Sequence, residues 1–267
     1  MAKIFVSLPV LGDPKLRMIQ SLYQAIDSCK EHEITIYSSD NDSMISRVRN
    51  VHLSVFYNDY PDYDYFVSID SDLEIINRFT TNNLFTKLVE HDAKFVGGLY
   101  ALKREGEPKC SSVPMDRSGV PQLNSGLKNM LWMSTGCWCL KREAITKMIE
   151  AYPDLTYDGD DNASGKKIYG LYIPMFKEFM VNGREVKKFL SEDWSFCERW
   201  RALGGQIFAD TSIVLKHYGT KPYSLWNFEV IAKKKISDDA LQEIIAQPSE
   251  ENTPLDVLPE AGFELGG

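Results

Sequence analysis

Two aspartates, Asp70 and Asp72, have the residue type and the spacing that can hold a divalent cation. They come directly after YFVSI, a run of aromatic and β-branched residues that predicts a buried strand. Two carboxylates two positions apart at a strand edge point the same way and can share one Mg²⁺ or Mn²⁺, which takes oxygen ligands together with substrate phosphates. Such a cation neutralises a diphosphate leaving group. The pair on its own also fits a solvated turn.

A second pair of acids, Glu192 and Asp193, opens the amphipathic segment EDWSFCERWRALG. This segment predicts a helix with Gly204 as its C-cap. Carboxylates at the first turn of a helix interact favourably with its dipole, so capping alone is a sufficient reason for them.

The elements that must position these acids alternate between strand and helix over the first hundred residues. Such alternation predicts βαβ units and a largely parallel sheet, in which ligands bind at the carboxyl ends of the strands. The predicted strands are 3–10, 33–39, 63–70, 93–102, 131–142, 206–210 and 212–217, and the predicted helices are 14–31, 44–55, 82–91, 142–151 and 192–204. The Asp- and Gly-rich segment 158–165 is interpreted as a solvated loop.

Charge is distributed unevenly along the 267 residues, whose formal net charge is −8. Eight of the 38 acidic residues, and no Lys or Arg, follow Lys235, so the rest of the chain has 30 acidic and 30 basic residues. We therefore expect one domain over 1–235 and an acidic, partly disordered tail over 236–267. A neutral body gives no electrostatic footprint for a nucleic-acid partner.

The remaining composition indicates a reduced, non-membrane environment. No apolar run approaches the roughly 18 to 20 residues that span a bilayer. The five cysteines form no CxxC pair, and no signal peptide is recognisable, so we expect free thiols in a protein of the cytoplasm. Cys137 and Cys139 alternate along a predicted strand and would share one face.

An ordered series of short motifs resembles GT-A glycosyltransferases, over roughly residues 3 to 223. The series is SIDSD, VGGLYALK, STGCWCLKR, LSEDWSFCERWRALGG and LKHYG. It is especially similar to the small family-two-like enzymes of bacteriophages and bacteria, which places a viral copy in the host cytoplasm. The resemblance implies an α/β, Rossmann-like GT-A domain with a mainly parallel central sheet flanked by helices.

The resemblance also implies roles for the acids. Asp72 binds the metal, Mn²⁺ or Mg²⁺, directly, while Asp70 meets the ribose or the waters of the metal. His217, at the end of SIVLK, completes the metal site, although it also fits an ordinary strand-end histidine. Asp193, with Glu192 as the fallback, is the general base of an inverting transfer. Processive relatives carry Gln-x-x-Arg-Trp after this pair, and the absence of that Gln here favours the transfer of a single sugar.

Contacts to the donor are expected from four further residues. Asp40 follows the second predicted strand, where the family often places an acid on the nucleobase or ribose. Arg47 and Asn50 flank the apolar face of a predicted helix, and Arg47 is expected on the base or phosphate, with a solvated helix face as the equal alternative. Gly98 would let the backbone approach the sugar closely, or it marks a bulge.

These observations predict a metal-dependent glycosyltransferase that moves one sugar from a nucleotide sugar, UDP- or GDP-linked, to a hydroxyl acceptor with inversion. Two alternatives stay open. One is a phage-type transferase acting on modified DNA bases, for which the neutral body gives no support. The other is a sugar nucleotidyltransferase, which usually needs a Gly-rich basic loop after the first strand, whereas LPVLGDPKLR contains one Gly.

Overall fold

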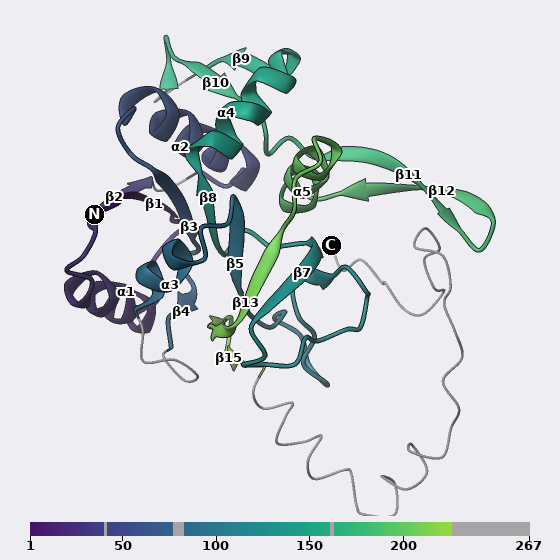
Figure 1. Ribbon diagram of the computed structural model, residues 1–267, viewed down its shortest axis with the longest axis horizontal. Helices are drawn as coiled ribbons and strands as arrows, with labels where there is room; N and C mark the ends of the chain where they lie inside the picture. The colour runs from purple at the N-terminus through teal and green to yellow at the C-terminus, as the bar shows by residue number, and fades with distance from the viewer. Residues whose placement is uncertain (40–41, 77–82, 161–162, 226–267) are drawn as a thin grey trace, which may run out of the picture.

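The computed structural model describes residues 1–39, 42–76, 83–160 and 163–225 (Figure 1). An eight-stranded sheet forms its centre, in the order β2–β1–β3–β8–β5–β13–β7–β6. The strands β2, β1, β3, β5 and β13 run in one direction, and β8 and β7 run against them. The bounds are β1 Lys3–Pro9, β2 Glu33–Ser39, β3 Tyr65–Ile69, β5 Phe95–Leu99, β6 Val113–Pro114, β7 Leu127–Trp132, β8 Cys137–Lys141 and β13 Phe208–Val214.

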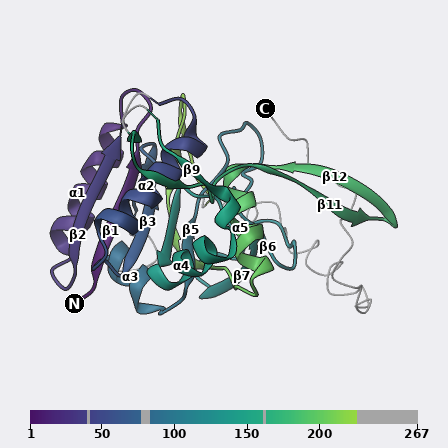
Figure 2. The ribbon, with the colours of Figure 1, turned by 90° about the horizontal axis from the view of Figure 1, so that it is seen from above.

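Helices cover both faces of this sheet, as the alternating strands and helices predict (Figures 1 and 2). One apolar cluster packs α1 and α3 against one face, and the other packs α2, α4 and α5 against the opposite face. Strand β1 supplies both, since Ile4 and Val6 belong to the first cluster and Phe5 to the second. The helices are α1 Leu16–Ser28, α2 Ile45–Asp59, α3 Leu84–Glu90, α4 Arg142–Ala151 and α5 Glu192–Ala202, with a 3₁₀ turn at Pro153–Leu155.

Three small sheets complete the fold. The first is β15–β14–β4 (Leu73–Glu74, Lys216–Tyr218 and Pro222–Tyr223 in chain order). The second joins β9 (Thr156–Asp158) to β10 (Lys167–Tyr169), so strands flank the segment that the sequence analysis interpreted only as a loop. The third is the hairpin of β11 (Met175–Val181) and β12 (Arg184–Leu190), which projects from the body (Figure 2).

Two predicted strand assignments are wrong. The predicted strand 131–142 is two strands, β7 and β8, and β13 and β5 lie between them in the sheet. The chain bends at 134–136 without reversing, because β7 and β8 run in the same direction. There Gly136 N–H donates to the Tyr100 hydroxyl at 3.0 Å, and Gly136 O accepts from Asp70 N–H at 3.0 Å. The break between the predicted strands 206–210 and 212–217 is also misplaced. Strand β13 runs through it to Val214, with a register shift against β5, and β14 follows as a separate strand.

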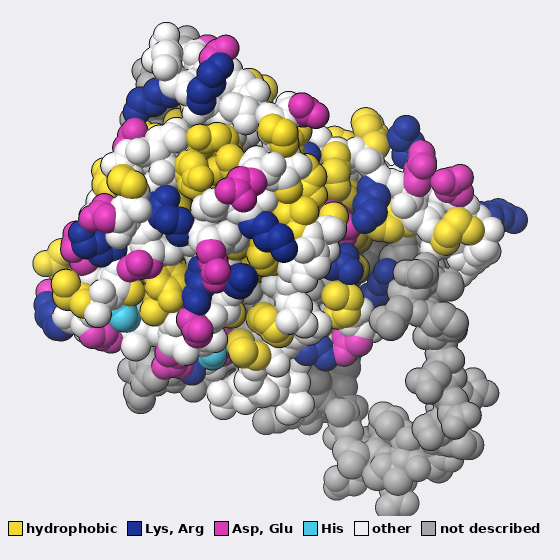
Figure 3. Space-filling model, turned by 45° about the horizontal axis from the view of Figure 1, so that its top comes forward, with side chains coloured by type: hydrophobic (Ala, Val, Ile, Leu, Met, Phe, Trp, Pro, Cys, Tyr) yellow, Lys and Arg dark blue, Asp and Glu magenta, His cyan; other side chains and the backbone are white. Residues whose placement is uncertain are grey.

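The cysteines and the surface charges can be compared with the expectations from composition. All five cysteines are free, and Cys137 and Cys139 are buried in the same apolar cluster. Within the described ranges, no helix is long and apolar enough to cross a membrane. On the face shown in Figure 3, basic and acidic side chains are interspersed. The tail predicted from residue 236 lies outside the described residues.

Candidate active site at the carboxyl ends of β1 and β3

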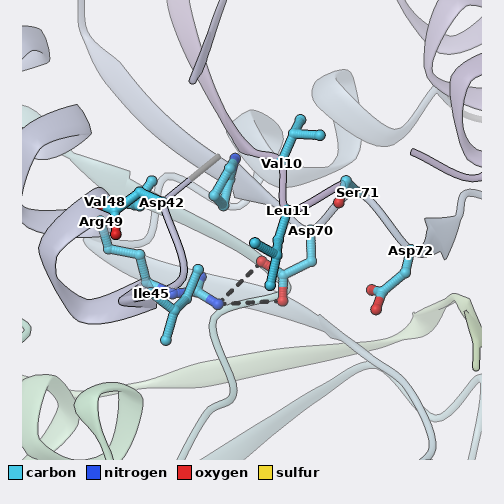
Figure 4. Close-up of a pocket in the computed structure, with 10 residues that line it drawn as sticks. Val10, Leu11, Asp42, Ile45, Val48, Arg49, Asp70, Ser71 and Asp72 are labelled. Carbon is cyan, nitrogen blue, oxygen red and sulfur yellow. Dashed lines mark hydrogen bonds and ion pairs between the residues drawn. The ribbon is translucent and has the colours of Figure 1, made fainter. Parts of the chain in front are cut away.

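Asp70 lies at the carboxyl end of β3, among the residues that line a surface cavity (Figure 4). Its carbonyl accepts a hydrogen bond from Leu73 N–H at 3.1 Å, so the chain turns at once into β4. The pair Asp70–Asp72 therefore stands on a turn rather than on an extended strand edge, and its two carboxylates have different partners. The residues lining the cavity are Pro9, Val10, Leu11, Asp42, Ile45, Val48, Arg49, Asp70, Ser71 and Asp72.

Arg49, on α2, is the partner of Asp70 and was missed by the sequence analysis. Its Nη2 lies 3.1 Å from Asp70 Oδ1 and 3.3 Å from Oδ2, and its Nε lies 3.8 Å from Glu192 Oε1. Its side chain is only 6% exposed. Burial disfavours the charged guanidinium, but the charges of Asp70 and Glu192 outweigh that effect and raise the pKa of Arg49.

The sequence carried a signal for this arginine. The buried face of α2 repeats at Arg49, Leu53 and Phe56, which is helical spacing. An arginine on a buried helix face needs anionic partners, because an unpaired charge is costly to remove from water. The run Arg47–Asn50 was noticed in the sequence, but its first arginine was selected instead of the buried one.

Asp72 lies between His217 and Lys103. Its Oδ1 is 3.4 Å from His217 Nε2, and its Oδ2 accepts a hydrogen bond from Lys103 Nζ. Burial works against the ionised carboxylate, but the hydrogen bonds and charges of His217 and Lys103 outweigh it, so the pKa of Asp72 is lowered. Asp72 is thus held as a carboxylate.

Main-chain pairing brings Asp72 and His217 together across 145 positions of sequence. Strand β14 pairs antiparallel with β4, with His217 opposite Leu73, and Tyr218 N–H donates to Asp72 O at 2.9 Å. The imidazole is oriented by Ala101 O, which lies 2.8 Å from His217 Nδ1. Because a carbonyl only accepts, Nδ1 carries a proton, and Nε2 is the ring nitrogen that faces Asp72.

The donor set fits a divalent cation in part. No group of three or more His, Cys, Asp or Glu side chains suited to a metal occurs in the part of the chain that the structure describes. Asp72 Oδ1 is buried without a hydrogen-bond partner, however, and His217 Nε2 faces it while Nδ1 donates to a backbone carbonyl, an arrangement typical of a metal-ligating histidine. Their 3.4 Å separation suits two ligands at roughly 2.1 Å from one ion. Asp72 and His217 would hold the ion, and phosphate oxygens and water would supply the other ligands.

Glu192 and Asp193 open α5 on the far side of Arg49 from Asp70. Asp193 Oδ1 accepts from Trp194 N–H at 2.8 Å and from the Ser191 hydroxyl, so part of its role is to order the helix start. Burial raises the pKa of Asp193. Burial and the charge of Asp193 raise the pKa of Glu192. Raised carboxyl pKa values suit groups that must accept a proton near neutral pH.

The residues expected at the donor have other partners in this structure. Arg47 pairs with Asp42 at 2.7 Å. Asn50 is buried, and its Oδ1 accepts from Tyr172 N–H at 2.8 Å. A Cβ at Gly98 would lie 2.5 Å from Ile213 Cγ2, so packing against β13 already requires a glycine there. None of Arg47, Asn50 and Gly98 lines the cavity, and Asp40 lies outside the described residues.

Asp42 lies two residues before the N-cap of α2. The N-cap residue is Met44, whose N–H donates to Asp42 Oδ1 at 2.9 Å. Trp138 and Trp194 differ in exposure, which decides whether either could stack on an acceptor sugar. Trp138 is fully buried in the core, whereas Trp194 is partly exposed and stacks on Trp132 at 4.3 Å between ring centroids. Of the two, only Trp194 has an exposed surface that an acceptor could contact.

The sequence matches no known protein family and no curated protein. Solved structures do match the fold. A197 from STIV aligns with a TM-score of 0.50 and 17% identity over 82% of this chain and 86% of A197. A glycosyltransferase involved in the glycosylation of the major capsid of PBCV-1 aligns with a TM-score of 0.33 and 10% identity, over 57% of this chain and 67% of that one. Apo-UDP-glucose pyrophosphorylase aligns with a TM-score of 0.35 and 10% identity, over 87% and 82%.

The similarity to A197 concerns the fold alone. With the sheet order and the helices on both faces, it confirms the predicted fold class, an α/β domain with a mainly parallel central sheet flanked by helices. The other two similarities are too weak to say anything about the activity of this chain.

Proposed function

We propose that this protein is a metal-dependent glycosyltransferase that moves one sugar from a nucleoside-diphosphate sugar to a hydroxyl group. The observation that carries the proposal is the pair formed by Asp72 Oδ1 and His217 Nε2, at the edge of a cavity that two acids also line. This pair has the chemistry of a half-built site for Mn²⁺ or Mg²⁺, which a bound diphosphate would complete. The cation would stabilise the charge that develops on the departing diphosphate.

The second half of the proposal assigns proton transfer to the start of α5. Asp193, with Glu192 as the alternative, takes the proton of the acceptor hydroxyl. The oxygen then forms a bond to the anomeric carbon, while the bond from that carbon to the diphosphate oxygen breaks and the diphosphate leaves with the electron pair. Attack opposite the leaving group inverts the anomeric centre. The raised pKa of Asp193 supports this role, because a more basic carboxylate accepts a proton more readily.

Arg49 connects the two halves. Its guanidinium lies between Asp70, beside the proposed donor site, and Glu192, beside the proposed base. We assign it a positioning role, because it fixes the carboxylate of Asp70 and offsets the negative charge that three neighbouring carboxylates would otherwise concentrate. Asp70, held in this way, would meet the ribose or the waters of the metal.

A turnover assay tests the proposal. Release of nucleoside diphosphate from a panel of UDP- and GDP-sugars would be followed with Mn²⁺ and with EDTA, with water as the acceptor. We expect release from one donor class, lost with EDTA and in Asp72→Ala. The matched control is Asp59→Ala, which removes an exposed aspartate paired with Lys166 at 2.8 Å and should leave release unchanged. Equal release by Asp72→Ala and wild type would refute the assignment.

A further inference from the structure

Lys103 is hydrogen-bonded to Asp72, the carboxylate that would bind the proposed metal. It lies in the segment after β5, and its Nζ donates to Asp72 Oδ2. Its side chain is 37% exposed, so the ammonium is reachable from solvent. The stem lies against the turn between β14 and β15, where a Cβ at Gly219 would be 3.3 Å from Lys103 Cδ. The chain thus places a cation of its own at the site.

The same segment of chain also orients the imidazole ring of His217. Ala101 O fixes the ring of His217, and Lys103, two residues further on, binds Asp72. One short stretch therefore presents the metal-facing nitrogen and at the same time neutralises the neighbouring carboxylate. This arrangement leaves Asp72 Oδ1 as the buried oxygen without a hydrogen bond, while Oδ2 is taken.

A divalent cation and the ammonium cannot share Asp72 without cost. A metal between Asp72 Oδ1 and His217 Nε2 would lie on the order of 4–5 Å from an ammonium on Oδ2, and that repulsion alone lowers metal affinity at least tenfold, even in water. Entry of the metal is therefore favoured when Lys103 leaves Asp72. Because its stem is packed against Gly219, a displaced Lys103 stays beside the site.

We propose that Lys103 is a tethered competitor of the divalent cation, which holds Asp72 when no metal is bound and which the metal must displace. The inference rests on the proposed function, since it takes Asp72 as a metal ligand. It adds a residue that sets the metal affinity, with the opposite sign to a ligand: removing Lys103 strengthens metal binding, whereas removing a ligand weakens it.

The test is a titration of each purified full-length protein with Mn²⁺ alone, at fixed pH and ionic strength, with free Mn²⁺ measured by electron paramagnetic resonance. Lys103→Met should lower the Kd by about fivefold, and Lys103→Arg, which keeps the charge, should stay at or above the wild-type Kd. The matched control is Lys221→Met, because Lys221 carries the same charge nearby but pairs with Glu105 at 2.7 Å. Its Kd should stay within about twofold of wild type.

Failure of the inference is distinguishable from failure of the proposed function. If Asp72→Asn abolishes Mn²⁺ binding but Lys103→Met binds no more tightly than wild type, the metal site stands and the competition is refuted. If Asp72→Asn binds Mn²⁺ as well as wild type, the metal site itself is refuted, and if Lys103→Met binds no Mn²⁺ at all, the competition is refuted. Circular dichroism of each variant confirms that the fold is retained.

Discussion

Replacing Arg49 with methionine removes the only side chain seen to pair with both Asp70 and Glu192, among the residues that the structure describes, and keeps most of the apolar stem. The side chain is 6% exposed and lies 3.1 Å from the nearer carboxylate. Breaking a buried ion pair from one side costs about 3–5 kcal/mol, because the remaining charges stay buried without a partner. We expect Arg49→Met to lower the free energy of unfolding by that amount.

The matched control is Arg47→Met, which removes an arginine two residues away on the same helix. Its side chain is 38% exposed and pairs with Asp42. Exposed pairs contribute about 0–1 kcal/mol, so this variant should stay close to wild type. Urea unfolding followed by tryptophan fluorescence and circular dichroism measures both free energies. A loss below about 1 kcal/mol for Arg49→Met, equal to that of the control, would refute the reasoning.

A double-mutant cycle then tests whether the loss comes from the ion pair. If Arg49→Met is destabilising because Asp70 is left charged and buried, adding Asp70→Asn should recover part of the loss. Residues in direct contact show coupling energies of about 0.5–3 kcal/mol, and we expect a value of at least 1 kcal/mol here. Additive effects of the two substitutions would mean that lost packing, rather than charge, explains the result.

The remaining predictions concern the fold and the proposed base. Burial and the charge of Arg49 lower the pKa of His52 from 6.5 to about 3. As the pH falls below 6.5, His52 is therefore protonated in the unfolded chain but stays neutral in the folded chain. Stability should therefore fall by roughly 2–3 kcal/mol between pH 6.5 and 4.5, and urea titrations of His52→Gln should lack this component. Asp193→Asn should lower kcat by roughly 10²–10⁴-fold, while the calorimetric Kd of the nucleotide stays unchanged. Glu192→Gln should lower kcat less. A larger loss of kcat in Glu192→Gln than in Asp193→Asn would assign the base to Glu192 instead. Gly98→Ala should cost about 1–3 kcal/mol in thermal unfolding, and a neutral Gly98→Ala would contradict the packing account.

Much of the fold is predictable because the buried parallel strands are local signals. Strands β1 and β3 read as continuous apolar runs, since both of their faces are covered by helices. The order β8–β5–β13–β7 is not local, because strands far apart in sequence pair there. That is why a single apolar run at 131–142 predicted one strand, although its middle, Ser134–Gly136, turns the chain into another part of the sheet.

One missed element did carry a signal. The β11–β12 hairpin turns at Asn182–Gly183, both with positive φ (49° and 74°), and this dipeptide between alternating residues is a strong indicator of a hairpin. Mixed charges and exposed aromatics along the strands, such as Phe176 and Phe189, hide the apolar pattern that buried strands show. The Asn-Gly turn, rather than the hydrophobicity of the strands, is the feature that predicts this hairpin.

The candidate site was only partly predictable for similar reasons. Asp70 and Asp72 follow a recognisable strand, so their place at the sheet edge is a local inference. His217 joins them only through the pairing of β14 with β4, and its selection came from resemblance to a family rather than from spacing. Lys103 reaches Asp72 from a polar loop that shows no periodic pattern. No property of the sequence places that lysine at the site.

Calorimetric titration of UDP, GDP, CMP and dTDP, with and without Mn²⁺, tests the central claim most directly. The titrations would be made on wild type, Asp72→Ala and the surface control Asp59→Ala. The account predicts that one nucleotide binds only with Mn²⁺, that Asp72→Ala abolishes this binding and that Asp59→Ala preserves it. Absence of nucleotide binding in the presence of Mn²⁺, or equal binding by Asp72→Ala, would contradict the assignment of Asp72 and the proposed transferase with it.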